Sequence, residues 1–428
     1  MSIRALARAL GAAIVLLHAV PAHAASPRPS THAPLTLAQA LSAALSANPR
    51  LTVAERDIGM AGGRGLQAAL LPNPVLSLEV DNAFGSGSYS GLDLADQTLQ
   101  VSQLVELGGK REARIAAANA GVGVARWERE ALRLQVLAET TAAFVTVLSA
   151  QRRLDILKDQ LGAMERWAPL LHTRVEAGAS SASEIARSKV AADLARIDQD
   201  RARAALLTAR RELALLMGLK DARFGAVTGN LVRLSAPPPL DRILKSAQEN
   251  PQLTRFTALK AQRSAELSGA RAQAVPDVTL GVGYRHYNET ADSGMVLSLS
   301  MPLPVFDRNQ GNIVEAGEAL RRAEAEEAVV RSALISQLGR AYDGLKAAHD
   351  EVALLRDSTL PEARTAFEGI EGGYSEGRYS LLELLDAQSS LAETQLRELD
   401  ALVAYHTALA TLEGLIGRPV TFAKGKSK

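Results

Sequence analysis

The sequence predicts a mainly α-helical chain with a small β-sheet and an internal two-fold repeat. The repeat is read from Asn48-Pro49, which recurs as Asn250-Pro251 in the same local context. The sheet is read from two pairs of short segments in which apolar and polar residues alternate strictly. The helices are read from two segments far longer than the average helix of a globular protein.

The N-terminal residues have the pattern of a secretion signal. Arg4 and Arg8 precede an apolar stretch at residues 10–20, and Ala22-His23-Ala24 resembles a small-residue cleavage site. We therefore expect a signal peptide over residues 1–25. The chain has no cysteine, so disulfides and a lipid-modified N-terminal cysteine are excluded. No later apolar run reaches the length of a membrane-spanning helix, and we expect none.

Composition argues against several functional classes. The 48 basic and 47 acidic residues nearly cancel, so a nucleic-acid surface is not expected. Ala, Leu, Arg and Glu dominate, which is typical of coiled coils. No phosphate-binding loop or catalytic motif stands in a matching context, so we expect neither an enzyme nor a cofactor. No His pair has the spacing of a helical metal site, so no resident metal is expected.

The first structural repeat is predicted over residues 26–235. A helix over 36–71, broken at Asn48-Pro49, precedes strands at 75–81 and 98–105. A long helix then runs from 110 to about 175, interrupted by Pro169, and residues 183–216 return antiparallel to it. At about 1.5 Å per residue the long helix spans roughly 100 Å. The hairpin between the two helices has its tip near Gly178.

The second structural repeat is predicted over residues 236–418, after Pro237-Pro238-Pro239. Strands at 277–285 and 294–301 flank a loop at 286–293. A helix over 312–374, interrupted by Pro361, leads to a tip near Gly377 and a return helix over 381–416. Residues 419–428 form a C-terminal tail.

The four strands each present one apolar face. The residues expected on these faces are Leu76, Leu78, Val80, Leu99, Val101, Val278, Leu280, Val282, Leu297 and Leu299. A sheet that packs on the helices of a soluble protein is one interpretation. The other places these faces in lipid, where the sheet must close because open edges cannot be satisfied. Eight strands from two copies would make a narrow barrel, and twelve from three would leave an open lumen.

Two motifs carry a resemblance to a known family. Residues 301–311 read Met-Pro-Leu-Pro-Val-Phe-Asp-Arg-Asn-Gln-Gly, and Gly373-Tyr374-Ser375-Glu376-Gly377 precedes Leu381-Leu382-Glu383. With these motifs the chain resembles the TolC family of outer membrane efflux ducts, and within it the CzcC-like heavy-metal branch. The resemblance implies a homotrimer with a twelve-stranded membrane β-barrel, four strands per chain, continued by an α-helical periplasmic tunnel. It also implies a periplasmic adaptor protein and an inner membrane RND-type transporter as partners.

The resemblance implies a periplasmic gate on the second tip. Glu383 and Asp386 match acidic positions that ring the constriction, and Glu184 is the counterpart of Glu383 in the first repeat. Tyr374 matches a residue that latches neighbouring coils, with Ser183 and Glu184 as its expected partners. Tyr379 stands where the family has a basic latch residue, so the charged half of this latch is missing.

The resemblance also implies that the two helical tips contact the adaptor. The expected contact residues are Gly178, Ser180, Ser181, Gly377, Arg378 and Ser380, with Arg174 and Val175 close by. Within the same class, a duct for drug efflux or type I protein secretion remains open. A soluble periplasmic coiled-coil scaffold is the alternative from another class.

Overall fold

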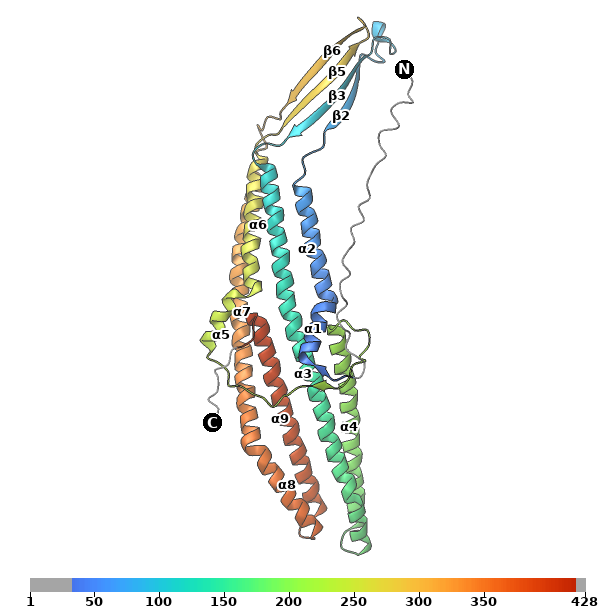
Figure 1. Ribbon diagram of the computed structural model, residues 1–428, viewed down its shortest axis with the longest axis vertical. Helices are drawn as coiled ribbons and strands as arrows, with labels where there is room; N and C mark the ends of the chain where they lie inside the picture. Colours follow the sequence, from blue (N-terminus) through green and yellow to red (C-terminus); the bar gives the residue numbers. More distant parts are fainter. Residues whose placement is uncertain (1–32, 421–428) are drawn as a thin grey trace.

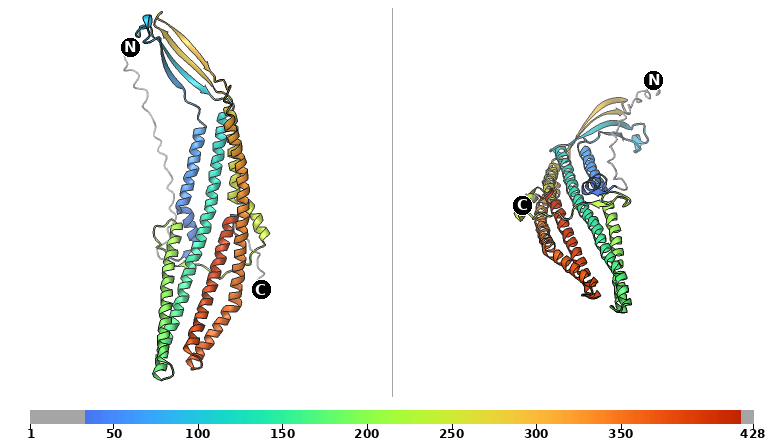
Figure 2. Two further views of the ribbon diagram at one scale, coloured as in Figure 1. Left: turned by 180° about the vertical axis from the view of Figure 1, so that it is seen from behind. Right: turned by 60° about the horizontal axis from the view of Figure 1, so that its bottom comes forward.

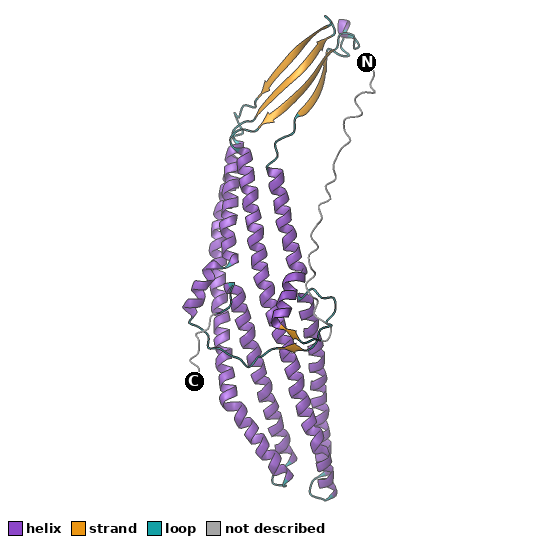
Figure 3. Cartoon of the chain, in the orientation of Figure 1, coloured by secondary structure: helices purple, strands orange, loops and turns teal. Residues whose placement is uncertain are grey.

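A computed structural model describes residues 33–420 of the chain as a long helical rod that carries a β-sheet at one end (Figures 1 and 3). The predicted signal peptide and residues 421–428 of the predicted tail lie outside this range. The elements before the midpoint are β1 (Leu35–Thr36), α1 (Leu37–Ala47), α2 (Pro49–Ala68), β2 (Val75–Asp81), β3 (Asp96–Val105), α3 (Lys110–Glu176), α4 (Ala182–Leu216) and β4 (Val227–Thr228). Those after it are α5 (Leu240–Ser246), α6 (Pro251–Gln273), β5 (Val278–Tyr287), β6 (Asp292–Ser300), α7 (Gln310–Leu354), α8 (Leu360–Ser375) and α9 (Leu381–Ile416).

The rod is two helical hairpins side by side, each extended upward by a further helix (Figures 1 and 2). α3 with α4 forms the first hairpin, and α7–α8 with α9 forms the second. The seam residues of α3 are apolar at alternating three- and four-residue spacings, which turns them to one side of the helix. Val147, Leu154, Leu157, Leu161 and Met164 are all buried.

The prolines of the two long helices, Pro169 and Pro361, have different effects on the helices that contain them. α3 has 67 residues and runs through Pro169 without a break, so the expected interruption there is wrong. In the second repeat a π-helical turn at Leu355–Thr359 separates α7 from α8, just before Pro361. A π turn inserts one residue into the helical register and changes the direction of the helix. The second hairpin therefore bends where the first does not.

The repeated Asn-Pro motif joins helices end to end. Asn48 caps α2 by accepting a hydrogen bond from the backbone N–H of Arg50, at 2.9 Å, and its side-chain amide donates to the carbonyl of Leu216 at the end of α4, also at 2.9 Å. Asn250 repeats this arrangement, accepting from Gln252 at the start of α6 and donating to Leu415 near the end of α9. Each buried amide thus satisfies groups of two helix ends at once.

The hairpin between β5 and β6 is tighter than the sequence suggests. The expected loop over residues 286–293 is wrong, since His286 pairs with Ser293 and Tyr287 with Asp292 in the ladder. The polar residues at the end of β5 and at the start of β6 can therefore belong to the strands, because the hydrogen bonds of the ladder are made by the backbone and not by the side chains.

Two helices are long and apolar enough to cross a membrane by length and composition. They are α3 and α9, in which the most apolar window of 18 residues is 33% and 39% buried within the chain. The expectation that no such helix exists was based on unbroken apolar runs. Because core helices of soluble proteins have the same length and composition, this finding leaves that expectation standing.

Candidate functional site

The four long strands form one antiparallel sheet in the order β2-β3-β5-β6. Leu76 pairs with Val101, Val101 with Val282, and Val282 with Leu297. Directly opposed residues of an antiparallel sheet project to the same face, so these pairs define one apolar face. The same registers place all ten expected apolar residues on it.

This apolar face is exposed in the described part of the chain. Leu297 is 82% and Leu299 71% exposed, and no helix covers either the sheet or its faces (Figure 1). The opposite face is polar and better enclosed. There Arg285 donates hydrogen bonds to Asp81 at 2.7 Å and to Thr98 at 2.6 Å, and Thr98 is 2% exposed. The sheet is therefore apolar outside and polar inside, unlike the sheet of a soluble protein.

The sheet ends on both sides in an unpaired edge. β2 pairs only with β3, and β6 pairs only with β5. Unpaired N–H and C=O groups next to an apolar exposed face would be left without partners in hydrocarbon. These edges are suited to pairing with further copies of the chain.

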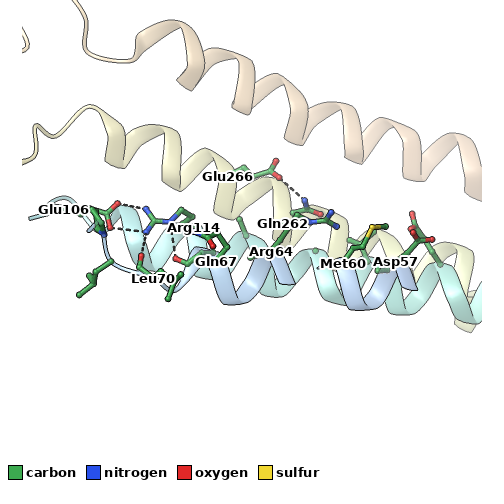
Figure 4. Close-up of a pocket in the computed structure, with 18 residues that line it drawn as sticks. Asp57, Met60, Arg64, Gln67, Leu70, Glu106, Arg114, Gln262 and Glu266 are labelled. Atoms are coloured by element: carbon green, nitrogen blue, oxygen red, sulfur yellow. Dashed lines mark hydrogen bonds and ion pairs between the residues drawn. The ribbon is translucent and has the colours of Figure 1, made fainter. Parts of the chain in front are cut away.

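An arginine ties the sheet to the helices below it. Arg114 of α3 pairs with Glu106, which follows β3, and donates to the carbonyls of Ala68 and Leu70 at the end of α2, at 3.1 and 3.2 Å. It borders a hollow of about 910 Å³ between α2, α3 and α6 (Figure 4). Since Arg114 is committed to these partners, it serves to fix the joint between sheet and rod.

The helical tips end in left-handed glycines. Gly178 has φ +70° and Gly377 φ +81°, a conformation that strains any residue with a Cβ. Neither position meets a crowded neighbour, so the glycines are required by the backbone rather than by packing. Ser181 caps α4 by accepting from the N–H of Ser183, and Arg378 pairs with Glu376 at 2.6 Å. The remaining expected contact residue of the first tip, Ser180, lies in the same turn.

Glu383 is the third residue of α9 and forms a capping box with Ser380, the N-cap residue. The backbone N–H and the hydroxyl of Ser380 both donate to one carboxylate oxygen of Glu383, each at 2.7 Å, and the Ser380 hydroxyl accepts from the N–H of Glu383. The hydrogen bond from the Ser380 backbone, followed by that from its hydroxyl, lowers the pKa of Glu383. Asp386 lies one helical turn later and is exposed, as is Glu383.

Tyr374 is held by Arg174 rather than by the expected partners. The guanidinium of Arg174 lies 4.8 Å from the centre of the Tyr374 ring and donates to its backbone oxygen at 2.7 Å. The Tyr374 hydroxyl is buried without a hydrogen-bond partner in the described structure, so the expected bond to Ser183 or Glu184 is not formed. The Ser183 hydroxyl instead bonds that of Ser181, while burial, and to a smaller degree the nearby Glu184, raises the pKa of Tyr374.

Tyr379 packs against the backbone of the helix before the turn. A Cβ at Gly373 would lie 2.4 Å from the Tyr379 ring, so the two positions are matched in size. Arg174 places a positive charge beside Tyr374 at the same turn. The sequence placed Arg174 near the tip but gave no sign of its pairing with Tyr374, since the two residues lie in different repeats.

No group of three or more potential metal-ligating carboxylate or imidazole side chains comes together within residues 33–420. His349, Tyr405 and His406 do lie together, but their partners are structural. The His406 ring bonds the carbonyl of Leu231 at 2.7 Å, and Tyr405 bonds the backbone of Ser235 in both directions. These contacts fasten the segment between the two repeats to α9.

Comparison with known proteins places these features in a family. Residues 40–219 and 243–418 match the family described as outer membrane efflux protein. The cobalt-zinc-cadmium resistance protein CzcC of Cupriavidus metallidurans is 30% identical over 90% of both chains. The nickel and cobalt resistance protein CnrC of the same organism is 27% identical over 78% of this chain and 79% of its own.

A solved structure shows the same fold. The CmeC outer membrane channel of Campylobacter jejuni superposes with a TM-score of 0.76 at 16% identity, covering 91% of this chain and 87% of that one. The predicted fold class, helices with a membrane sheet, is therefore confirmed, as is the predicted location in the outer membrane. The chain belongs to the outer membrane efflux protein family.

Proposed function

We propose that three copies of this chain form the exit duct of a tripartite efflux system for heavy-metal cations. The duct works with a periplasmic adaptor and a proton-driven RND-type transporter in the inner membrane. The metal assignment is supported by two relatives named for resistance to cobalt, zinc, cadmium or nickel. A duct passes its cargo on without holding it, so the function requires no cofactor, resident metal, nucleic acid or catalytic residue.

The observation that best supports a membrane duct is that the apolar face of the sheet is exposed and its polar face is enclosed. Its apolar face is exposed and its enclosed face holds the Arg285–Asp81 pair. Three sheets of four strands would close a twelve-stranded barrel wide enough for an aqueous lumen. The rod below it, with α3 about 100 Å long, continues such a lumen into the periplasm.

The gate belongs to the lower end of the second hairpin. Asp386 and Glu383 are exposed near the start of α9, and three copies would bring about six carboxylates around one axis. A ring of carboxylates attracts cations and repels anions. The Arg174–Tyr374 contact ties the second hairpin to the first and so holds the ring narrow.

The two tips present the docking surface for the adaptor. Gly178, Ser180, Ser181, Gly377, Arg378 and Ser380 surround the two turns at the far end of the rod. Most of these side chains are small or hydroxylated, which allows another helical hairpin tip to approach the turns closely.

Growth of a deletion strain tests the cargo. Without the duct, tolerance to zinc, cobalt, cadmium or nickel should fall, while tolerance to dyes and antibiotics should not. The wild-type gene should restore metal tolerance. A variant with Arg378→Glu tests the tips separately, because this exposed side chain lies in the second turn without a left-handed backbone; it should assemble without restoring tolerance. If the deletion strain loses tolerance to drugs but not to metals, the cargo of the duct is a drug rather than a metal cation.

A further inference from the structure

The edge strand β6 ends at Ser300, but its pattern continues beyond that residue. On the apolar face Leu297 and Leu299 are followed, at the same spacing, by Met301, Leu303 and Val305. These three side chains are 45%, 75% and 61% exposed. Since β5 begins at Val278 and Thr279 already pairs with Ser300, β5 has almost no residues left for them. Residues 301–305 therefore have the sequence pattern of a strand but pair with no strand in the described chain, where the Val305 N–H instead donates to the carbonyl of Leu303 at 2.9 Å.

The chain contains a template for the missing partner. Its two strand hairpins are copies, in which Leu76 of β2 corresponds to Val278 of β5. The helices that follow start at equivalent places, because Gly109 before α3 and Asn309 before α7 both have left-handed backbones, with φ 75° and 60°. Within the chain, the first hairpin joins the second through β3 and β5.

The β3–β5 ladder fixes how one hairpin meets the next. It pairs Val105 with Val278 and Val101 with Val282. In a closed ring, β6 stands in the place of β3, and β2 of the neighbouring copy stands in the place of β5. If this quasi-equivalence holds, the same ladder extends past Ser300.

We propose that residues 301–305 become part of β6 in the assembled duct and pair with β2 of the neighbouring copy. The template places Val305 opposite Leu76, Leu303 opposite Leu78 and Met301 opposite Val80 of that copy. The inference rests on the proposed closed trimer and specifies the register of its joints. It requires that the turn closed by the Val305 N–H and the Leu303 carbonyl opens on assembly. It also requires that the nitrogens of Pro302 and Pro304, which carry no hydrogen, face β5, where that strand has ended.

Phe306, which follows residues 301–305, makes the proposed contact between copies chemically different from the β3–β5 contact within the chain. Within the chain, Asp277 accepts from the N–H of Leu107 at 3.0 Å and pairs with Lys110 at 2.7 Å, which clamps the two hairpins with charge. In the joint between copies, the counterparts of Asp277 and Lys110 are Val75 and Gln310. Phe306, which is 92% exposed, then lies opposite Val75, which is 59% exposed. An apolar contact replaces the charged clamp, as is typical of interfaces between permanent subunits.

Cysteine cross-linking tests this register cleanly, because the chain has no cysteine of its own. The test variant carries Val305→Cys with Leu76→Cys. The displaced control carries Val305→Cys with Val80→Cys, which moves one thiol by four residues, about 13 Å along the same strand and face. The reference variant carries Val105→Cys with Val278→Cys, a pair opposed within the chain. Each variant is purified in detergent, its mass is measured, and it is then oxidised.

The expected result is a covalent trimer on a denaturing gel for Val305→Cys with Leu76→Cys. The displaced control should remain monomeric on that gel, and the reference should form a bridge within one chain. If the Val305 and Leu76 double variant does not assemble, Leu303→Cys with Leu78→Cys tests the same register.

Two outcomes overturn the proposal, and they can be told apart. A trimer by mass that yields no cross-link, or one that links equally in the displaced control, means that residues 301–305 face lipid or follow another register. In that case the duct itself still stands. A wild-type protein that forms no trimer in detergent removes the proposed function and this joint together.

Discussion

Arg174 binds Tyr374 twice, once through the backbone oxygen at 2.7 Å and once through the ring face at 4.8 Å. Arg174 belongs to α3 and Tyr374 to α8, so the contact joins the first hairpin to the second close to both tips. A second tie lies about two turns above it, where the Trp167 indole donates to Glu371 at 3.1 Å. Opening the lower end by moving one hairpin must first break these contacts.

Removing the Arg174 side chain should loosen the closed end. Arg174→Ala loses a charge-assisted hydrogen bond and a cation–π contact, together about 1–3 kcal/mol of support for the closed form. Single-channel conductance in planar bilayers should rise, and openings should become more frequent. Tyr374→Phe is the matched control, because it keeps the ring and the backbone oxygen and removes only an unpartnered hydroxyl. An equal rise in both variants would count against Arg174 as the tie.

The two acidic residues of the proposed gate should differ in the effects of their substitution. Asp386→Asn removes a charge without touching the helix cap, and should weaken the preference for cations over anions in reversal-potential measurements. Glu383→Ala removes a charge and the capping box, and should also destabilise the start of α9. Glu383→Gln can keep the cap and so isolates the charge. Unchanged ion preference in all three variants would mean that neither carboxylate lines the constriction.

The same cap makes the second tip sensitive to acid. Because Ser380 donates to Glu383, the carboxyl has a lowered pKa in the folded chain. The stabilising contribution is therefore complete above the ordinary carboxyl pKa of about 4.3 and is lost as the pH falls through the lowered value. Hydrogen exchange at the start of α9 should speed up in that acidic range beyond its intrinsic pH dependence. Glu383→Gln should show no such additional change, and a change of equal size there would assign the effect to another group.

The end-to-end helix joints should respond to loss of either asparagine. Asn250 is 1% and Asn48 3% exposed, and each amide serves two helix ends. Asn250→Ala or Asn48→Ala should each lower the free energy of unfolding by about 2 kcal/mol, measured with urea in detergent. Asn119→Ala, an exposed position within α3, is the control and should change stability little. A cost no larger than that of the control would show that the joints are held by packing alone.

The sheet could be predicted from the sequence because its signal is local. Strict alternation assigns Leu78 and Val282 to one face, and the ladder then agrees with it residue by residue. The direction of that face was harder to establish. Only the lack of anything to cover it pointed to lipid, and the structure shows this as exposed side chains at Leu297 and Leu299.

Contacts between the repeats could not be predicted in the same way. Arg174 and Tyr374 are 200 residues apart, and their pairing depends on how the two hairpins pack against each other. The capping box of Ser380 and Glu383, by contrast, follows the Ser-x-x-Glu pattern and was readable from the sequence. The family resemblance drew attention to Glu383 as a charge at the gate, and its local role as a helix cap was missed.

In the proposed duct the exposed apolar sheet enters lipid, and copies of the chain complete its ring. The mass and symmetry of the detergent-purified mature protein, measured by electron microscopy of single particles, test this most directly. We expect a three-fold symmetric particle with a short membrane band and a long helical tube. A monomer that is soluble without detergent would contradict it.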